Sequence, residues 1–408
     1  MKKRKGLKAL IAIIICFTII FGGGLSVLTV LKSIALKTTY KGTASEEVFD
    51  QYAAFIDESS FVTIEKKPGK EFVILNIADT HLSDFDYRLF TGYFALRDIK
   101  RLVKETKPDL ITLSGDNVCA KSQYNSIHKL TDFMNSLEIP WAPIFGNHDG
   151  EAENIDKDYL AEVMIGDPND PKNYCLMKKG PNNLGGEDDR GRRVGNYVIN
   201  IKENGKIIHS LIMMDSGRDQ LTELQVEWYK QVMRTIIYKY SSPLSPTKST
   251  LILHIPIAQY YFAYMEGYNM NKKEWKEGYR SSGSYGDCYE DVCCDKKKFK
   301  TRAEMVRSEE YSALLTKYPE YNTVEYESYF FKYGVPIDNG IFDALKIYGT
   351  DTVLCGHDHL NCFKTDYKGV NLIYSLKNGM GSGYKVGRNG GTVLSVTKEG
   401  ISSEFYYI

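Results

Sequence analysis

The stretch Trp141-Ala142-Pro143-Ile144-Phe145-Gly146-Asn147-His148-Asp149 joins a short apolar run to a polar end. The run predicts a short buried strand, and a strand that ends on glycine delivers the following polar side chains to a cleft. In open α/β sheets, ligands bind at the carboxyl ends of the strands. An asparagine oxygen suits a hard or borderline cation, and a histidine binds a metal or moves a proton. The stretch therefore predicts a polar site at a strand end.

The same arrangement of an apolar run and a polar end recurs along the chain. Its other occurrences are Phe72–Ala78 followed by Asp79-Thr80-His81, Leu110–Leu113 followed by Gly115-Asp116, Leu251–Leu253 followed by His254, and Thr352–Cys355 followed by Gly356-His357-Asp358-His359. Helical patterns separate the runs at 72–78, 110–113 and 141–145. Strands with polar ends that alternate with helices are typical of an α/β fold.

The rest of the chain predicts further elements of the same fold. Strands at 196–201 and 207–214 flank Asn204-Gly205, which is a strong hairpin signal. A helix is predicted over 222–240, and residues from about 260 to 335 are charged and rich in tyrosine, which indicates an insertion over one face of the domain. Alternating strands are predicted at 371–375, 392–397 and 402–407.

The amino-acid composition excludes few classes of globular protein. The 408 residues, with 43% hydrophobic and 25% charged residues, are ordinary for a globular protein. The formal net charge is zero, so there is no nucleic-acid-binding signal. The sequence gives no information on oligomeric state.

The N-terminus predicts a membrane segment. Residues 1–8 are basic and residues 9–31 are uncharged. At ~1.5 Å per residue, the uncharged stretch is roughly 35 Å long as a helix, which is enough to cross a bilayer core. The basic end belongs in the cytoplasm, so we expect a single-pass protein of the cell membrane with residues 70–408 outside and residues 32–69 as a linker. The alternative is a secreted protein whose signal peptide is cleaved near Ser33-Ile34-Ala35.

An exported location permits disulfides. Of the eight cysteines, Cys288, Cys293 and Cys294 lie together and are the expected place for one, although their pairing does not follow from the sequence. A zinc site at this cluster has less support, because no second C-x-x-C or histidine pair accompanies it.

The histidines gather at the strand ends. Five of the seven in the chain lie there, and His128 and His209 do not. Carboxylate, imidazole and amide groups together suit Mn, Fe or Zn. The candidate groups are too many for one tetrahedral ion but suit two metal ions about 3.5–4 Å apart that share a bridging carboxylate. His209 competes with His254, and we prefer His254 because it ends its strand.

The ordered series Asp-x-His, Gly-Asp, Gly-Asn-His-Asp, a lone His and Gly-His-x-His resembles the calcineurin-like metallophosphoesterase superfamily, over roughly residues 70 to 408. Within it, the chain is similar to the purple-acid-phosphatase-related branch with an Asp-x-His first motif. One departure concerns the metal-bound tyrosine of true purple acid phosphatases, which is replaced here by Cys119. Charge transfer from a tyrosinate to iron is therefore not expected, and the two ions would be divalent or of mixed valence.

The resemblance implies a four-layer α/β/β/α sandwich of two mixed sheets and a site at the strand ends. It also implies the role of each site residue: Asp79, His81 and His359 on the first metal; Asn147, His254 and His357 on the second; Asp116 as the bridge; and His148 as the proton donor. Three further residues are candidates for a supporting role: Asp149 would orient His148 or cap a helix, Asp215 would mark a strand end near the site, and Asn361 would bond a ligand histidine.

These residues predict a phosphoesterase that uses two metal ions, most simply for hydrolysis of phosphomonoesters by a metal-bridging hydroxide with His148 protonating the leaving group. One alternative is a phosphodiesterase acting on nucleotides or lipid headgroups. An alternative of another class is a surface protein that binds a partner and keeps the metal site only for structure.

Overall fold

The computed structural model describes residues 58–84, 91–185, 193–241, 247–269, 274–275, 294–380, 383, 387–398 and 400–408. The predicted membrane segment at 9–31, its flanks, and two cysteines of the predicted cluster, Cys288 and Cys293, lie outside these residues. Among the residues that are described, no helix is both long and apolar enough to cross a membrane. The membrane segment therefore stays a prediction.

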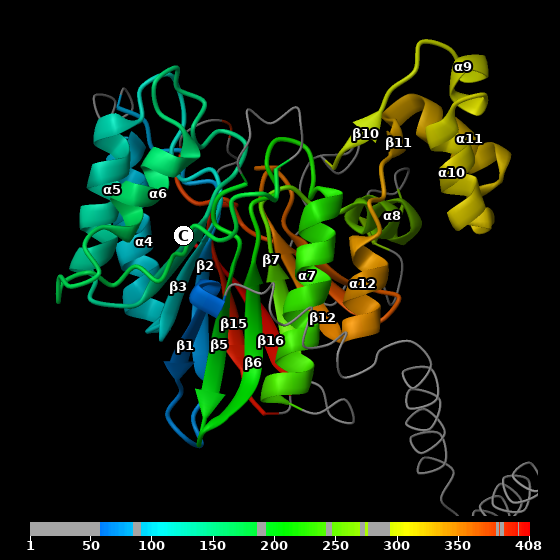
Figure 1. The fold of residues 1–408 in the computed structure, drawn as a ribbon. Helices are drawn as coiled ribbons and strands as arrows, with labels where there is room; N and C mark the ends of the chain where they lie inside the picture. Colours follow the sequence, from blue (N-terminus) through cyan, green and yellow to red (C-terminus); the bar gives the residue numbers. More distant parts are fainter. Residues whose placement is uncertain are drawn as a thin grey trace, which may run out of the picture. The chain divides into compact units, whose positions relative to one another are not determined.

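A five-stranded mixed sheet carries the first three predicted strand ends (Figure 1). Its strands, in spatial order, are β16 (Ile401–Tyr407), β15 (Gly390–Val396), β2 (Phe72–Ile77), β3 (Leu110–Ser114) and β4 (Trp141–Ile144). The last three are parallel neighbours, so their carboxyl ends meet at one edge of the sheet. The three buried strands predicted in this part of the chain are confirmed.

A seven-stranded mixed sheet carries the other two strand ends. Its strands, in spatial order, are β1 (Phe61–Glu65), β5 (Tyr197–Glu203), β6 (Lys206–Met213), β7 (Lys248–Ile252), β12 (Thr350–Cys355), β14 (Val370–Tyr374) and β13 (Phe363–Tyr367). β7 and β12 are parallel neighbours. The β5–β6 hairpin turns at Asn204 and Gly205, both with positive φ, as a two-residue hairpin loop requires.

Helices cover the outer face of each sheet (Figure 1). The helices beside the five-stranded sheet are α4 (Thr91–Thr106), α5 (Tyr124–Ser136) and α6 (Lys157–Ile165); those beside the other sheet are α7 (Glu223–Thr235), α8 (Ala258–Gly267) and α12 (Ile341–Tyr348). Side chains of β6 alternate between two cores. Leu211 and Met213 pack toward the five-stranded sheet, and Ile212 packs toward α7. An α/β fold with two mixed sheets is confirmed.

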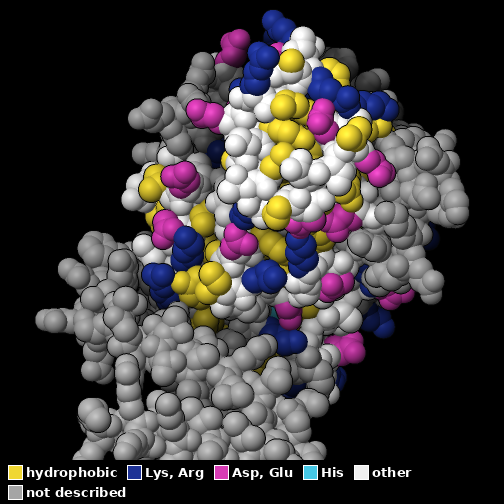
Figure 2. Space-filling view, turned by 90° about the vertical axis from the view of Figure 1, so that its right-hand side faces the viewer, with side chains coloured by type: hydrophobic (Ala, Val, Ile, Leu, Met, Phe, Trp, Pro, Cys, Tyr) yellow, Lys and Arg dark blue, Asp and Glu magenta, His cyan; other side chains and the backbone are white. Residues whose placement is uncertain are grey.

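The predicted insertion contains several short elements. They are β8 (Tyr268–Asn269), β9 (Glu274–Trp275), β10 (Lys296–Lys297), α9 (Arg302–Val306), α10 (Glu309–Lys317), the 3-10 turn η4 (Pro319–Tyr321), α11 (Val324–Tyr333) and β11 (Val335–Pro336). Figure 2 shows the side of the molecule that carries α9 to α11, where charges of both signs surround hydrophobic side chains. Tyr260, Tyr261 and Tyr264 at its start are fully buried, so these tyrosines form part of the core.

The structure corrects three details. The predicted linker at 32–69 is wrong at its end, because the 3-10 turn η1 (Glu58–Ser60) leads into β1, which pairs in parallel with β5. The helix predicted over 222–240 stops being α-helical at Thr235 and continues as the π-helical turn η3 (Ile236–Tyr240). Strand β13 was not predicted, since Lys364 and Asp366 interrupt its apolar pattern.

One hydrogen bond ties the two sheets together beside the opening stretch. The hydroxyl of Tyr197, in β5, donates to the carbonyl oxygen of Pro143, in β4, at 2.8 Å. Both groups are buried. Tyr197→Phe leaves that carbonyl without this donor, and we expect the free energy of unfolding to fall by about 1–3 kcal/mol. Urea unfolding of the full chain measures the change.

The matched control is Tyr93→Phe, which removes the hydroxyl of a tyrosine that is 58% exposed. Its effect should stay within about 0.5 kcal/mol. Equal stability of the Tyr197→Phe variant and the wild type would contradict the assigned role of this bond.

Candidate metal centre

The polar strand ends of both sheets meet in one place. Asp79 and His81 follow β2, and Asp116 follows β3. The other predicted ligands follow β4, β7 and β12, and they are Asn147, His254, His357 and His359. The side chains separate into two clusters of possible metal ligands.

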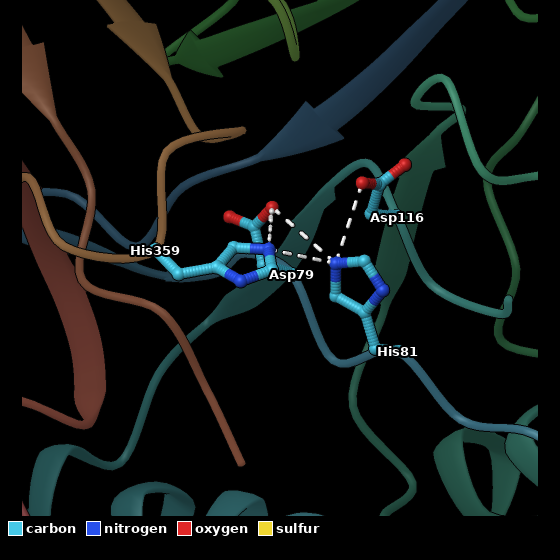
Figure 3. Close-up of side chains that lie close together, drawn as sticks. All are labelled: Asp79, His81, Asp116 and His359. Carbon is cyan, nitrogen blue, oxygen red and sulfur yellow. Dashed lines mark hydrogen bonds and ion pairs between the residues drawn. The ribbon is translucent and has the colours of Figure 1, made fainter. Parts of the chain in front are cut away.

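The first cluster consists of Asp79, His81, Asp116 and His359, whose ligand atoms all lie within 4.8 Å of one another (Figure 3). The Nε2 atoms of His81 and His359 are 2.9 Å apart. His81 Nε2 is also 3.3 Å from Asp116 Oδ2, and His359 Nε2 is 3.5 Å from Asp79 Oδ1. Two imidazole nitrogens and two carboxylates thus point to one small space.

The second cluster consists of Asp116, His254 and His357. His254 Nε2 lies 3.1 Å from Asp116 Oδ2 and 3.1 Å from the side-chain oxygen of Asn147. The Nδ1 atom of the same ring lies 3.0 Å from the carbonyl oxygen of Ser114, to which it donates. That bond fixes the tautomer and directs the Nε2 lone pair into the cluster, an arrangement typical of metal-binding histidines.

Asp116 belongs to both clusters. One oxygen, Oδ2, faces His81 on one side and His254 on the other, while Oδ1 accepts a hydrogen bond from the backbone N–H of His148 at 2.8 Å. A carboxylate can contact two cations at once, whereas a neutral imidazole has one free nitrogen. The position of Asp116 fits the predicted bridge.

The protonation states fit cations in both clusters. Burial lowers the pKa of His81 to about 3 and that of His357 to about 4, so both rings are neutral. Burial raises the pKa of the Asp79 and Asp116 carboxyls, but neighbouring histidines outweigh it and lower both pKa values below the usual range. Burial also lowers the pKa of His254, yet Asp116 raises it to about 9. A cation would compete with that proton. The donors therefore fit two metal ions.

Four of the ligand residues have a strained backbone. They lie in the left-handed region, with φ values of 57° for Asp79, 49° for His81, 49° for Asp116 and 84° for His357. Non-glycine residues seldom adopt this conformation, and such residues gather at functional sites, where surrounding contacts enforce them. The strain lets each ligand turn inward directly after its strand.

Glycines beside the ligands make room for this arrangement. A Cβ atom on Gly146 would lie 2.2 Å from Asp116 Oδ1 and 2.5 Å from the Asp116 backbone nitrogen. On Gly115 it would lie 2.6 Å from His254 Nδ1, and on Gly356 it would lie 2.7 Å from Asp79 Oδ2. Each glycine of the sequence motifs thus lies against a ligand that comes from a different strand.

His148 lies at the rim of the site. Its side chain is 40% exposed, and its ring centroid is 5.2 Å from that of His81. Its Nδ1 lies 2.8 Å from a carboxylate oxygen of Glu151, and the other oxygen of Glu151 accepts the Ala120 N–H at 2.5 Å. Glu151 was not predicted from the sequence, although an acidic residue three positions after the histidine was the available signal.

Asp149 has a different role from the one predicted. It neither orients the His148 ring nor caps a helix; it is buried and accepts the backbone N–H of Gly146 at 2.8 Å and that of Val118 at 2.9 Å. Burial, and after it the charge of Asp116, raises the pKa of Asp149 to about 6. The residue ties the loop after β4 to the loop after β3.

Of the two other supporting residues, Asp215 lies as predicted and Asn361 does not. Asp215 is buried at the end of β6, as predicted, and its carboxylate is 2.7 Å from Lys157 Nζ. Asn361 donates to Asp358 Oδ2 at 2.7 Å, so its amide bonds a carboxylate and not a ligand histidine. Its Oδ1 has no partner among the described residues.

Two residues weighed in the sequence lie outside the clusters. His209 is buried within β6 and bonds Thr250 Oγ1 at 2.9 Å, so the lone histidine of the site is His254. Cys119 Sγ lies 3.4 Å from the carbonyl oxygen of His81, beside the first cluster. It is not among the grouped ligand atoms of the described residues.

Gly146→Ala tests the steric argument. The added Cβ clashes with the backbone of Asp116, which flexible side chains cannot relieve, so we expect at least tenfold weaker metal binding. Elemental analysis of the full chain after equilibration with Mn²⁺ and gel filtration measures the bound metal.

The control is Gly205→Ala, at a hairpin position with φ of 77° and no heavy atom within 4 Å of the added Cβ. It costs about 1–2 kcal/mol of stability and should leave the metal content unchanged. Full metal content in folded Gly146→Ala protein would refute the steric argument.

The chain is similar to a known protein family and to several known proteins. The family model described as calcineurin-like phosphoesterase matches residues 72–279. Two relatives from Arabidopsis thaliana are named probable inactive purple acid phosphatase 14 and 29. The first is 24% identical over 346 residues, which cover 74% of this chain and 69% of the relative. The second is 23% identical over 357 residues, which cover 77% of this chain and 72% of that relative.

Among solved structures, that of a dimetal phosphatase from Danio rerio is similar over 82% of this chain and 99% of that one, with a TM-score of 0.41 and 11% identity. The family match spans just over half of the chain and includes the polar ends of β2, β3, β4 and β7. The chain belongs to the calcineurin-like phosphoesterase family, with relatives among the purple acid phosphatases.

Proposed function

We propose that the chain is an active phosphoesterase that depends on two metal ions and hydrolyses phosphomonoesters. The observation that carries the proposal is the pair of donor clusters that share Asp116, with His148 at their rim. Two relatives carry the word inactive in their names. This chain retains all seven predicted ligand residues, and they converge, which favours an active centre.

In this proposal the ligands divide as predicted. Asp79, His81 and His359 would hold the first ion, Asn147, His254 and His357 would hold the second, and Asp116 would be shared. When bound, two such ions supply positive charge to the phosphoryl oxygens and acidify the water that attacks phosphorus. Their identity among Mn, Fe and Zn is open, and the presence of Cys119 in place of a metal-bound tyrosine favours a divalent pair.

His148 supplies the proton for the leaving alkoxide. Because a carboxylate only accepts hydrogen bonds, the contact with Glu151 places a hydrogen on Nδ1 and leaves Nε2 to carry the transferred proton. The same contact orients the ring toward the clusters. The backbone N–H of His148 bonds Asp116, so the proton donor and the bridge keep a fixed separation.

The place of the reaction is also a proposal. We infer from the basic residues 1–8 and the uncharged residues 9–31 that the chain is anchored in the cell membrane with the phosphoesterase domain outside. Cleavage of the same segment would yield a secreted enzyme. Both cases place the substrate outside the cytoplasm.

Metal dependence is the first test. The purified full chain should hydrolyse p-nitrophenyl phosphate with Mn²⁺ or Zn²⁺, because the clusters lack a Lewis acid without them. Chelation should abolish turnover, and addition of the metal should restore it. Released p-nitrophenol measures the rate. Cleavage of bis(p-nitrophenyl) phosphate alone would identify a diesterase, and the absence of both bound metal and turnover would indicate a non-catalytic protein.

His148→Ala tests the proton donor. We expect kcat to fall by about 10²–10⁴-fold while two metal ions stay bound. The loss should be larger for an alkyl phosphate than for p-nitrophenyl phosphate, because a poorer leaving group needs the proton more. Steady-state kinetics with both esters, together with metal analysis, measures both effects.

The control is His128→Ala, which removes an exposed histidine outside the site and should leave kcat unchanged. Glu151→Gln should lower kcat less than His148→Ala does, because it removes only the charge beside the ring. Loss of metal from the His148→Ala protein would show instead that His148 is a ligand.

A further inference from the structure

We propose that Lys377 is a positioning residue of the metal centre, which fixes the peptide of Asp79 and thereby the ligands of the first cluster. The inference rests on the proposed two-metal centre. Lys377 follows β14 and lies almost 300 residues after Asp79 in the sequence. No sequence motif discussed above includes it.

The contact between the two residues is direct. Lys377 is 1% exposed, and its Nζ donates to the backbone carbonyl oxygen of Asp79 at 2.6 Å. Its backbone forms a parallel bridge with Ala78, at the end of β2, and its carbonyl oxygen accepts the Gly390 N–H at 3.0 Å. Because both ends of the side chain are anchored, the ammonium has little freedom to leave the Asp79 carbonyl.

The residues after Lys377 support the same turn. The backbone N–H of Asn378 donates to the carbonyl oxygen of Ala78 at 2.8 Å. A Cβ atom on Gly379 would lie 2.8 Å from Ala95 Cβ and 3.6 Å from the carbonyl oxygen of Thr80, so glycine is needed for close packing there. Lys377 to Gly379 therefore lie along one side of the turn that carries Asp79 and His81.

The loop after β3 holds the other side of this turn. The Asp79 N–H donates to the Gly115 carbonyl oxygen at 3.1 Å, and the His81 N–H donates to the Asp116 carbonyl oxygen at 2.8 Å. Neither bond uses the carbonyl oxygen of Asp79, which accepts the hydrogen bond from Lys377 instead. The left-handed conformation of Asp79 and His81 persists only if such contacts enforce it.

A buried ammonium is costly, and this cost argues for a specific role. Moving a charge out of water is unfavourable unless it is hydrogen-bonded, and Leu or Met would fill the same space without that cost. A bond from a charged donor is about twice as strong as a neutral one. The lysine thus provides a strong donor at the carbonyl of a strained ligand residue.

The test compares variants of the full chain titrated with Mn²⁺ in a calorimeter. Lys377→Met keeps the length of the side chain but removes the donor, and we expect one of two binding steps to weaken by about 10- to 100-fold. Lys377→Arg retains a charged donor and should recover most of the affinity. Circular dichroism at the same temperature establishes that each variant is folded.

Lys66→Met is the matched control. Lys66 is also buried, but its ammonium pairs with Glu203 at 2.8 Å in the β1–β5 region and not with the metal ligands. This variant should lose stability and bind both ions as the wild type does, which separates a local role from a general loss of stability.

The outcomes distinguish this inference from the proposed function. If Lys377→Met binds both ions with wild-type affinity, or more tightly because a positive charge is gone, Lys377 has no positioning role and the proposed function stands. If both Lys377→Met and Lys66→Met weaken binding equally, the effect is general and the inference fails. A wild-type chain that binds no Mn²⁺, Zn²⁺ or Fe²⁺ would overturn the proposed function and the inference together.

Discussion

The site depends on the position of a single carboxylate. Asp116 Oδ2 contacts a histidine from the β2 loop at 3.3 Å and a histidine from the end of β7 at 3.1 Å. These strands belong to different sheets, so the two sheets must place their loops against each other to within a fraction of an ångström. The apolar core between the sheets sets this distance, because close-packed side chains such as Leu211 and Leu354 resist compression.

The same geometry has an energetic cost that the fold must offset. Four ligand residues in the left-handed region each cost about 1–3 kcal/mol, and buried carboxylates lose their hydration. Backbone donors compensate. The His148 N–H donates to Asp116, and the backbone nitrogen of His357 lies 3.1 Å from both carboxylate oxygens of Asp79. Two bound cations would complete the compensation, which is why the folded site favours their binding.

The sequence predicted the fold and the convergence of these polar side chains for a physical reason. A strand buried on both faces is a continuous apolar run, and the polar residues directly after it must lie at the sheet edge. That logic identified Asp79, Asp116 and His254 without knowledge of their distances. Strand β1 was missed because it is short, lies at an edge and is only half-buried, so its apolar pattern is weak.

Partners distant in the sequence were not predictable in the same way. Lys377 contacts Asp79 across 298 positions, and only the pairing of its backbone with Ala78 brings it there. Adjacency in the chain was misleading for Asp149, whose side chain turns away from the neighbouring His148 and accepts backbone N–H groups. Glu151 is more exposed and meets the ring instead. Within this loop, the buried Asp149 therefore holds the backbone, whereas the more exposed Glu151 contacts the proposed proton donor His148.

Charge balance favours a monoester as the substrate of the proposed centre. The clusters hold two carboxylates, Asp79 and Asp116, while the other ligands are imidazoles and one amide. Two divalent ions would carry four positive charges and the attacking hydroxide one negative charge, so the loaded centre keeps an excess of one positive charge, to which the nearby Lys377 adds a second. A phosphomonoester carries about −1.5 to −2 charges at pH 7, whereas a diester carries a single one. Because buried charges interact strongly at low dielectric, the dianion compensates more of this excess, and the centre should discriminate in favour of it.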